Sequence, residues 1–256
     1  MNADAAQYAT VSTGNLFAYC ENDPLNYVDF WGHAPSLYTL TKMHNAVVAS
    51  AQKYLWSRGI ITSSEVLTCQ IYSITGRMDI YSYTHNMVWE VKRNNTLGRN
   101  AGINQLNRYV KSYVYSLYHS WLHIKRTPQR GTIPVYGAVT MNDYLVTYHS
   151  DPSTSALILY DYMTLRQAAE ILYEVTTSTS AELAKLFAGI SNNAKKKATV
   201  IITRIASLLR FGIIFGGNSI NQKISKISNF LKQANPEVLG LVAILILVAA
   251  GIPIPV

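Results

Sequence analysis

Hydrophobic and polar residues alternate with the period of a β-strand on both sides of a short polar segment, residues 83–86. The flanking runs, MDIYS (78–82) and MVWEV (87–91), are rich in the β-branched and aromatic residues that suit a half-buried sheet surface. The polar segment YTHN is short enough to close a hairpin between them. A four-residue loop would place Ser82 opposite Met87, so the pattern predicts an antiparallel pair of strands.

The same kind of pattern predicts helices and strands along most of the chain. Residues 36–59 have apolar positions at helical spacing and stop at Gly59, a residue type that commonly terminates helices. We expect a second helix over 98–118, a third over 165–175, and further strands over 133–140, 144–150 and 156–163. Helices and strands that alternate in this way indicate an α/β fold.

The C-terminal part of the chain differs from the rest in composition. A basic run, NNAKKK, is followed by apolar segments, and the last nineteen residues carry no charge. Nineteen residues are close to the lower limit of about 20 for a membrane-spanning helix. Three interpretations remain open for residues 195–256: contact with a membrane, a helical hairpin packed against the protein or a partner, or a segment kept unfolded inside a carrier shell.

Charged residues in the hairpin strands are the first sign of chemistry. The predicted register places Asp79 opposite Glu90, and strand alternation puts Lys92 on the same face as Glu90. Two nearby carboxylates repel each other unless a cation shares the site. Mg²⁺ binds carboxylate oxygens and is completed by water and substrate phosphate, so the trio is suited to metal-assisted phosphodiester hydrolysis. An exposed hairpin with an ordinary cross-strand salt bridge is the alternative.

The charge balance favours a polyanionic partner. The formal net charge is +8, and residues 30–142 contain twelve Lys and Arg but only three acids. A surface normally mixes both signs, and an excess of positive charge suits binding to a phosphate backbone. The three acids, Glu65, Asp79 and Glu90, are therefore the candidate metal ligands, and Glu65 could equally be a surface residue ahead of the strand-like run VLTCQIYSI.

These motifs resemble those of the PD-(D/E)XK nucleases. The likeness lies in three motifs: GRMDI, WEVK and AGINQLNRYV. Ten residues separate Asp79 of the first motif from Glu90 of the second. The likeness is closest to the restriction-endonuclease-like toxin domains at the C-termini of bacterial polymorphic toxins. The resemblance implies a central mixed sheet flanked by helices, here with a C-terminal hydrophobic helical extension.

The resemblance also assigns roles to particular residues. It implies that Asp79 and Glu90, with Glu65 as a possible third acid, bind Mg²⁺ or Mn²⁺, and that Lys92 orients or activates the attacking water. Gln105 and Tyr109, one helical turn apart, would support the site. Backbone phosphates would be held by the nearby arginines Arg77, Arg93, Arg99 and Arg108. His44, on the first predicted helix, is interpreted as a structural or surface residue.

A second resemblance concerns the N-terminus. The segment GNLFAYCENDPLNYVDFWGH (14–33) is similar to the closing part of an Rhs/YD-repeat core, after which cargo toxins begin, although Phe30 stands where that core has proline. This resemblance implies an Rhs-type carrier, and it divides the chain into an Rhs-like end (1–33), a nuclease domain (34–176) and a helical C-terminal region (177–256).

The function expected from the sequence is a metal-dependent endonuclease toxin, acting on DNA more than on RNA. We expect secretion within a larger toxin, action in the target-cell cytoplasm, and a cognate immunity protein. The start of the chain lacks the pattern of a signal peptide, and two cysteines are too few for a disulfide framework. A membrane-active toxin and a non-catalytic nucleic-acid-binding module are the alternative functions.

Overall fold

The structure is a computed structural model of all 256 residues, of which it describes 35–70, 73–114, 126–178, 196, 199–200, 202–203 and 219–249. The predicted Rhs-like segment, residues 1–33, lies outside these described residues. So does most of the basic run that precedes the apolar tail.

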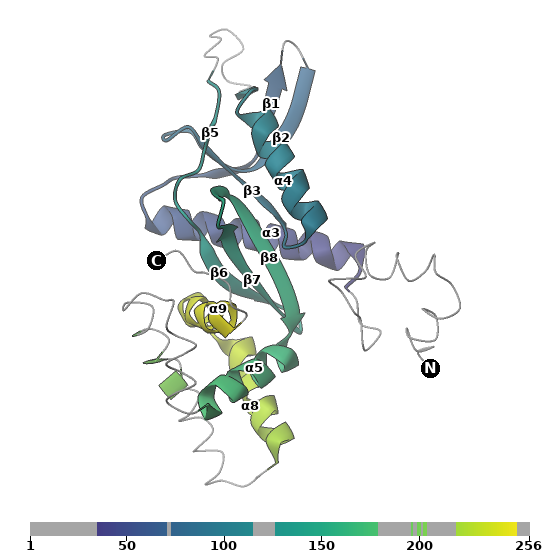
Figure 1. The fold of residues 1–256 in the computed structure, drawn as a ribbon, viewed down its shortest axis with the longest axis vertical. Coiled ribbons are helices and arrows are strands. Elements are labelled where there is room, and N and C mark those ends of the chain that lie inside the picture. Colours follow the sequence, from purple (N-terminus) through teal and green to yellow (C-terminus); the bar gives the residue numbers. More distant parts are fainter. Residues whose placement is uncertain are drawn as a thin grey trace, which may run out of the picture.

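A mixed sheet of eight strands, flanked by helices, forms the centre of the fold, which confirms the predicted α/β class (Figure 1). Seven strands follow the order β4-β1-β2-β3-β8-β7-β6, and β5 pairs with β3. The strands are β1 (Ser63–Gln70), β2 (Ser73–Ser82), β3 (Met87–Arg93), β4 (Tyr113–Val114), β5 (Gln129–Arg130), β6 (Tyr136–Met141), β7 (Tyr144–Asp151) and β8 (Thr154–Thr164). All pairs of strands are antiparallel, including β2 and β3, except that β3 runs parallel to β8 and to β5.

The first predicted helix is confirmed as α3 (Leu37–Ser57). Its first turn is capped by the Ser36 hydroxyl, which accepts a hydrogen bond from the Thr39 N–H at 3.2 Å. The chain leaves the helix at Gly59 with φ +79°, a backbone conformation that glycine adopts without a steric penalty. The apolar face of α3 packs on one side of the sheet, in a cluster that includes Trp89 and Ile158.

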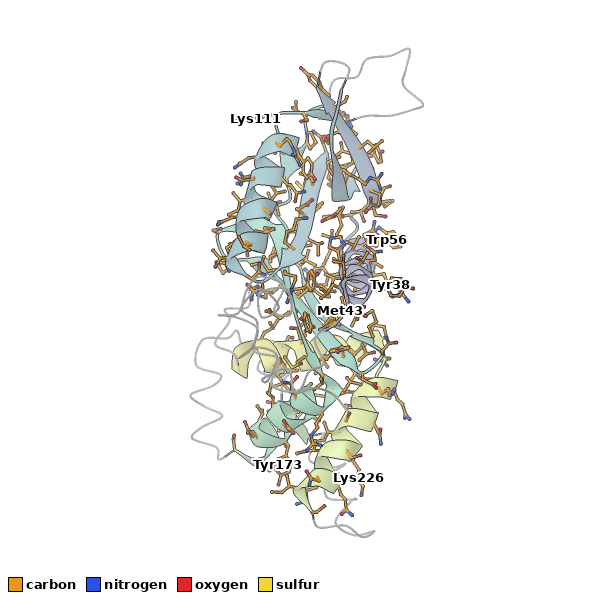
Figure 2. All side chains as sticks on the ribbon, turned by 90° about the vertical axis from the view of Figure 1, so that its right-hand side faces the viewer. Tyr38, Met43, Trp56, Lys111, Tyr173 and Lys226 are labelled. Atoms are coloured by element: carbon orange, nitrogen blue, oxygen red, sulfur yellow. The ribbon has the colours of Figure 1, made fainter. Side chains whose placement is uncertain are left out.

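Helix α4 (Thr96–Tyr109) covers the opposite side of the sheet (Figure 2). Asn95 caps it by accepting a hydrogen bond from the Gly98 N–H. The prediction of a helix over 98–118 was wrong for residues 110–114, because α4 ends at Tyr109 and the chain turns into β4, and residues 115–118 lie outside the described residues. The run VLTCQIYSI is likewise divided between two strands, since β1 ends at Gln70 and β2 begins at Ser73.

Three further helices lie at the other end of the sheet: α5 (Leu165–Thr177), α8 (Ile220–Gln233) and α9 (Pro236–Ala249). The helix predicted over 165–175 is confirmed as α5, which begins with a capping box formed by Thr164 and Gln167. Residues of α5, α8 and α9 share one hydrophobic cluster with β6 and β7. Within the described residues, no helix is long and apolar enough to cross a membrane.

Candidate functional site

The candidate site lies where the ladder between β2 and β3 stops. The first residues of β3 pair with β2, in the register Ile80–Trp89, Tyr81–Val88 and Ser82–Met87. From Glu90 onwards β3 pairs with β8, which lies along its other edge. The hairpin and the Ser82–Met87 pairing are confirmed, but the ladder stops one position before Asp79 and Glu90. The two strands therefore part at the two acids.

Asp79 lies in this fork between the strands. The residue is 8% exposed, and its Oδ2 accepts a hydrogen bond from the Val91 backbone N–H at 2.8 Å. The same oxygen lies 3.3 Å from Nε2 of His44 and 3.8 Å from Nζ of Lys92. The carboxylate thus takes the place of a strand partner for β3, which fixes its position relative to Glu90 and Lys92.

Glu90 is the more deeply buried acid, at 1% exposure. Its Oε1 lies 2.5 Å from Nζ of Lys92, so one ammonium group contacts both carboxylates. Its Oε2 is buried and has no hydrogen-bond partner among the described residues. An unsatisfied carboxylate oxygen is costly in a protein interior, so this atom marks a place where an additional cation or donor would be stabilising.

The surroundings of the two acids shift their pKa values in opposite directions. Burial and then the charge of Asp79 raise the pKa of Glu90 to about 7, despite the opposing attraction of Lys92. Burial also acts to raise the pKa of Asp79, but the hydrogen bond from His44, the charge of Lys92 and the Val91 N–H together bring it below its ordinary value. Asp79 is therefore ionised at neutral pH, whereas Glu90 titrates there.

His44 reaches the site from α3 and was not among the predicted site residues. Burial lowers the pKa of its imidazole, but the hydrogen bond and the charge of Asp79 outweigh that effect, so the pKa lies above its ordinary value. The other ring nitrogen lies 3.3 Å from the Asn45 side-chain oxygen. A signal was present in the sequence, because His44 falls on the apolar face of α3, between Leu40 and Val47, where a titratable residue is unusual.

Helix α4 contributes the other support residues. The Tyr109 hydroxyl donates a hydrogen bond to the Arg77 carbonyl at 2.6 Å. Burial, followed by the charges of Glu90 and Asp79, raises the pKa of this phenol, which places the ring in the field of both acids. Gln105 lies one turn earlier, and its side-chain oxygen is buried without a hydrogen-bond partner in the described part of the chain.

A glycine on α4 permits the helix to approach the site closely. A Cβ at Gly102 would lie 2.4 Å from Leu157 Cδ1 and 3.1 Å from Lys92 Cγ. The stem of Lys92 therefore runs directly under the helix backbone. Its aliphatic chain is held between α4 and β8, so the ammonium has little freedom to leave the carboxylates.

Glu65 and the predicted arginines Arg99 and Arg93 make their contacts outside the group of Asp79, Glu90 and Lys92. Glu65 forms an exposed ion pair with Arg77 at 2.9 Å, and nothing in the described residues connects its carboxylate to Asp79 or Glu90. Arg99 contacts Asp151 at 3.0 Å. Arg93 lies on the face of β3 opposite Lys92, where it donates a hydrogen bond to the Tyr162 hydroxyl at 3.1 Å. These contacts leave the predicted arginine set spread over both faces of the sheet.

Arg108 lies beside Tyr109, one of the residues of α4 that support the site. Its side chain is exposed and lies over the Tyr109 ring, with the guanidinium carbon 5.8 Å from the ring centre. The site proper therefore consists of Asp79, Glu90, Lys92 and His44, with Tyr109 and Gln105 behind them on α4.

The donor set of the site is compatible with a hard divalent cation. Among the described residues, no three His, Cys, Asp and Glu side chains form a group that could hold a metal ion by themselves. Mg²⁺ does not need such a group, because it is commonly bound through one or two carboxylates plus water and substrate phosphate. Asp79 and the unsatisfied oxygen of Glu90 would supply that pair of carboxylates.

Comparisons of the chain with protein-family models, with curated proteins and with solved structures find no match.

Proposed function

We propose that the protein is a metal-dependent phosphodiester hydrolase, a nuclease acting on DNA more than on RNA. The observation that carries this proposal is the convergence of two buried carboxylates on one lysine at the fork between β2 and β3. The spacing of Asp79, Glu90 and Lys92, and the order of strands and helix that brings them together, support a restriction-endonuclease-like fold.

In the proposed mechanism Asp79 and Glu90 would hold Mg²⁺ or Mn²⁺. When bound, the ion would polarise a phosphate oxygen of the scissile bond. Lys92 is held by both carboxylates, and it orients the attacking water and stabilises the negative charge that develops on the phosphate. Val91 N–H and His44 fix Asp79, while Tyr109 holds the backbone of β2 through the Arg77 carbonyl.

Glu65 is a weaker candidate than the other two acids because its carboxylate is already paired with Arg77 on the surface. We therefore assign metal binding to Asp79 and Glu90. The proposed biological setting follows the motifs: the nuclease is the toxic part of an Rhs-type carrier, is secreted with it, acts in the target-cell cytoplasm and is neutralised by a cognate immunity protein.

The experiment is a cleavage assay on plasmid DNA and on RNA, with Mg²⁺ and with EDTA. We compare the wild type with Asp79→Asn, Glu90→Gln and Lys92→Met, and with Glu170→Gln as a matched control. Glu170 is a surface residue of α5 paired with Arg166, far in sequence from the site. We expect cleavage by the wild type and the control only, and only with the metal ion.

The outcomes distinguish the functions considered above. DNA binding without cleavage by the wild type would make the protein a non-catalytic nucleic-acid-binding module. Cleavage that persists in folded Glu90→Gln and Lys92→Met would remove the assigned site. Leakage of dye from liposomes that is indifferent to all three substitutions would indicate a membrane-active protein instead.

A further inference from the structure

The outer face of α3 is unusual because it combines exposed aromatic rings with positive charge. We define this face by the residues that point away from the sheet: Tyr38, Lys42, Asn45, Ala49, Lys53 and Trp56. Figure 2 shows Tyr38 and Trp56 on the same side of the helix, with Met43 on the side towards the sheet. Tyr38 is 69% exposed and Trp56 is 50% exposed, so both rings are accessible to a ligand.

The charge on this face has one sign. Residues 36–64 contain Lys42, Lys53 and Arg58 and no Asp or Glu. Two of these cations lie over tyrosine rings, because the Lys42 Nζ is 4.3 Å from the Tyr38 ring centre and the Arg58 Cζ is 5.3 Å from that of Tyr54. Both cations are thereby held against aromatic rings of α3.

We propose that the outer face of α3 binds an unpaired nucleic-acid strand. Surfaces that bind single strands combine a line of positive charge, which follows the phosphates, with aromatic side chains on which bases stack. Bases in a duplex are stacked on their neighbours, so rings such as those of Tyr38 and Trp56 gain contacts from an unpaired strand that a duplex cannot give. An acidic protein would use the lysines but not the stacking surface of the rings.

The dimensions of the helix agree with this ligand. Tyr38 and Trp56 are eighteen positions apart, or about 27 Å along the helix axis. That length corresponds to about eight nucleotides of a stacked strand. The same helix carries His44 on its inner side, 3.3 Å from Asp79. The inference rests on the proposed function only in taking nucleic acid as the substrate.

The test is a binding measurement in EDTA that does not depend on cleavage. Fluorescence anisotropy of labelled twelve-nucleotide oligothymidylate is recorded for the wild type, for Lys42→Ala/Lys53→Ala, and for Tyr38→Leu/Trp56→Leu, which keeps apolar bulk but removes the rings. Lys196→Ala/Lys226→Ala is the matched control, because it removes two exposed lysines elsewhere. Lys42→Arg/Lys53→Arg retains the charge.

We expect Tyr38→Leu/Trp56→Leu to weaken binding by about 25-fold or more, because two rings are removed and each base stacked on a ring contributes at least about fivefold. We expect Lys42→Ala/Lys53→Ala to weaken binding and to reduce the slope of log K against log salt by about 1.4. The arginine pair and the Lys196/Lys226 control should bind within twofold of the wild type. Circular dichroism of each variant verifies that the helix is intact.

Three results would overturn the proposal. The first is equal binding by the wild type and both α3 variants. The second is tighter binding of a matched duplex through the same residues, and the third is displacement of the oligonucleotide by polyglutamate of equal charge at equal concentration, which would indicate an acidic protein ligand. A protein that binds the oligonucleotide through α3 but never cleaves would leave this inference standing and remove the proposed nuclease activity.

Discussion

The Glu90→Gln substitution tests the buried carboxylate pair, because its effects on stability and on activity should have opposite signs. Gln keeps the shape of Glu90 but carries no charge. In the metal-free protein, ionised Glu90 is buried beside ionised Asp79, and its contact with Lys92 only partly compensates. We expect the substitution to abolish cleavage and, in the absence of metal, to stabilise the fold at alkaline pH.

The magnitude follows from the pKa of Glu90. The difference between the ordinary value of 4.5 and the raised value of about 7 corresponds to about 3 kcal/mol. Below pH 4.5 the carboxyl group is protonated in both the folded and unfolded states, so the raised pKa has no effect on stability. Between pH 4.5 and 7 the folded protein binds a proton that the unfolded chain has released, so the free energy of unfolding falls as the pH rises through this window. Above pH 7 the full loss is present.

The assay is urea denaturation in EDTA at pH 4.5 and pH 8.5. We expect the difference in unfolding free energy between Glu90→Gln and the wild type to increase by about 3 kcal/mol in favour of the variant at the higher pH. Glu170→Gln removes an exposed acid and should show a change below about 1 kcal/mol. If the difference in unfolding free energy between Glu90→Gln and the wild type were the same at both pH values, the reasoning that burial raises the pKa of Glu90 would be refuted.

Three other substitutions test separate parts of the structure. His44→Gln can still donate a hydrogen bond to Asp79 whereas His44→Ala cannot, so we expect the cleavage rate across a Mg²⁺ titration to be lower for Ala than for Gln; equal rates would exclude His44 from positioning Asp79. Gly102→Ala should destabilise the protein by about 1–3 kcal/mol and reduce cleavage, because the added methyl group meets Leu157 and the Lys92 stem; urea denaturation and the plasmid assay measure the two effects. Leu245→Ala in α9 removes a fully buried side chain and should cost about 2–5 kcal/mol by urea denaturation, while a loss below about 0.5 kcal/mol would contradict the packing of α9 in the core.

The parts of the fold that the sequence predicted are those determined by local interactions. The helix over 36–59 has its cap, its apolar face and its glycine stop within one segment, and the 78–91 hairpin has its turn between its own two strands. The end of α4 was missed because Tyr113 and Val114 pair with β1, far away in the sequence, and this pairing overrides the helical pattern that continues past Tyr109.

The site required contacts that no local pattern encodes. The spacing of Asp79 and Glu90 did not reveal that the β2–β3 ladder stops at Trp89, where the Asp79 carboxylate takes the Val91 N–H instead of a backbone carbonyl of β2, nor that β8, more than sixty residues later, pairs with the other edge of β3. The role of His44 depends in the same way on the docking of α3 against the sheet, 35 positions away from Asp79. Sequence spacing therefore identified which side chains are chemically suited to the site, but not the fork in the sheet that brings them together.

The apolar C-terminal segment shows the same limit from composition. An uncharged run of Val, Leu and Ile is compatible with lipid, with a protein core or with a partner, because all three remove apolar surface from water equally well. In the structure most side chains of α9 between Val238 and Leu247 are buried, and the helix packs against β6, α5 and β7. The surfaces that cover α9 are apolar residues of β6 and α5, among them Ala138 and Leu172, which are themselves buried.

The most informative signal in the sequence was a local inconsistency. A strand that is apolar on both sides has no structural use for Glu90, since a buried carboxylate costs free energy unless it is neutralised or bound. Lys92 satisfies one of its oxygens and leaves the other without a partner in the described structure. Replacing a buried ion pair with apolar residues of similar volume is often neutral or stabilising. We therefore propose that these charges serve a ligand, and the unsatisfied oxygen of Glu90 is the atom at which that ligand should be sought.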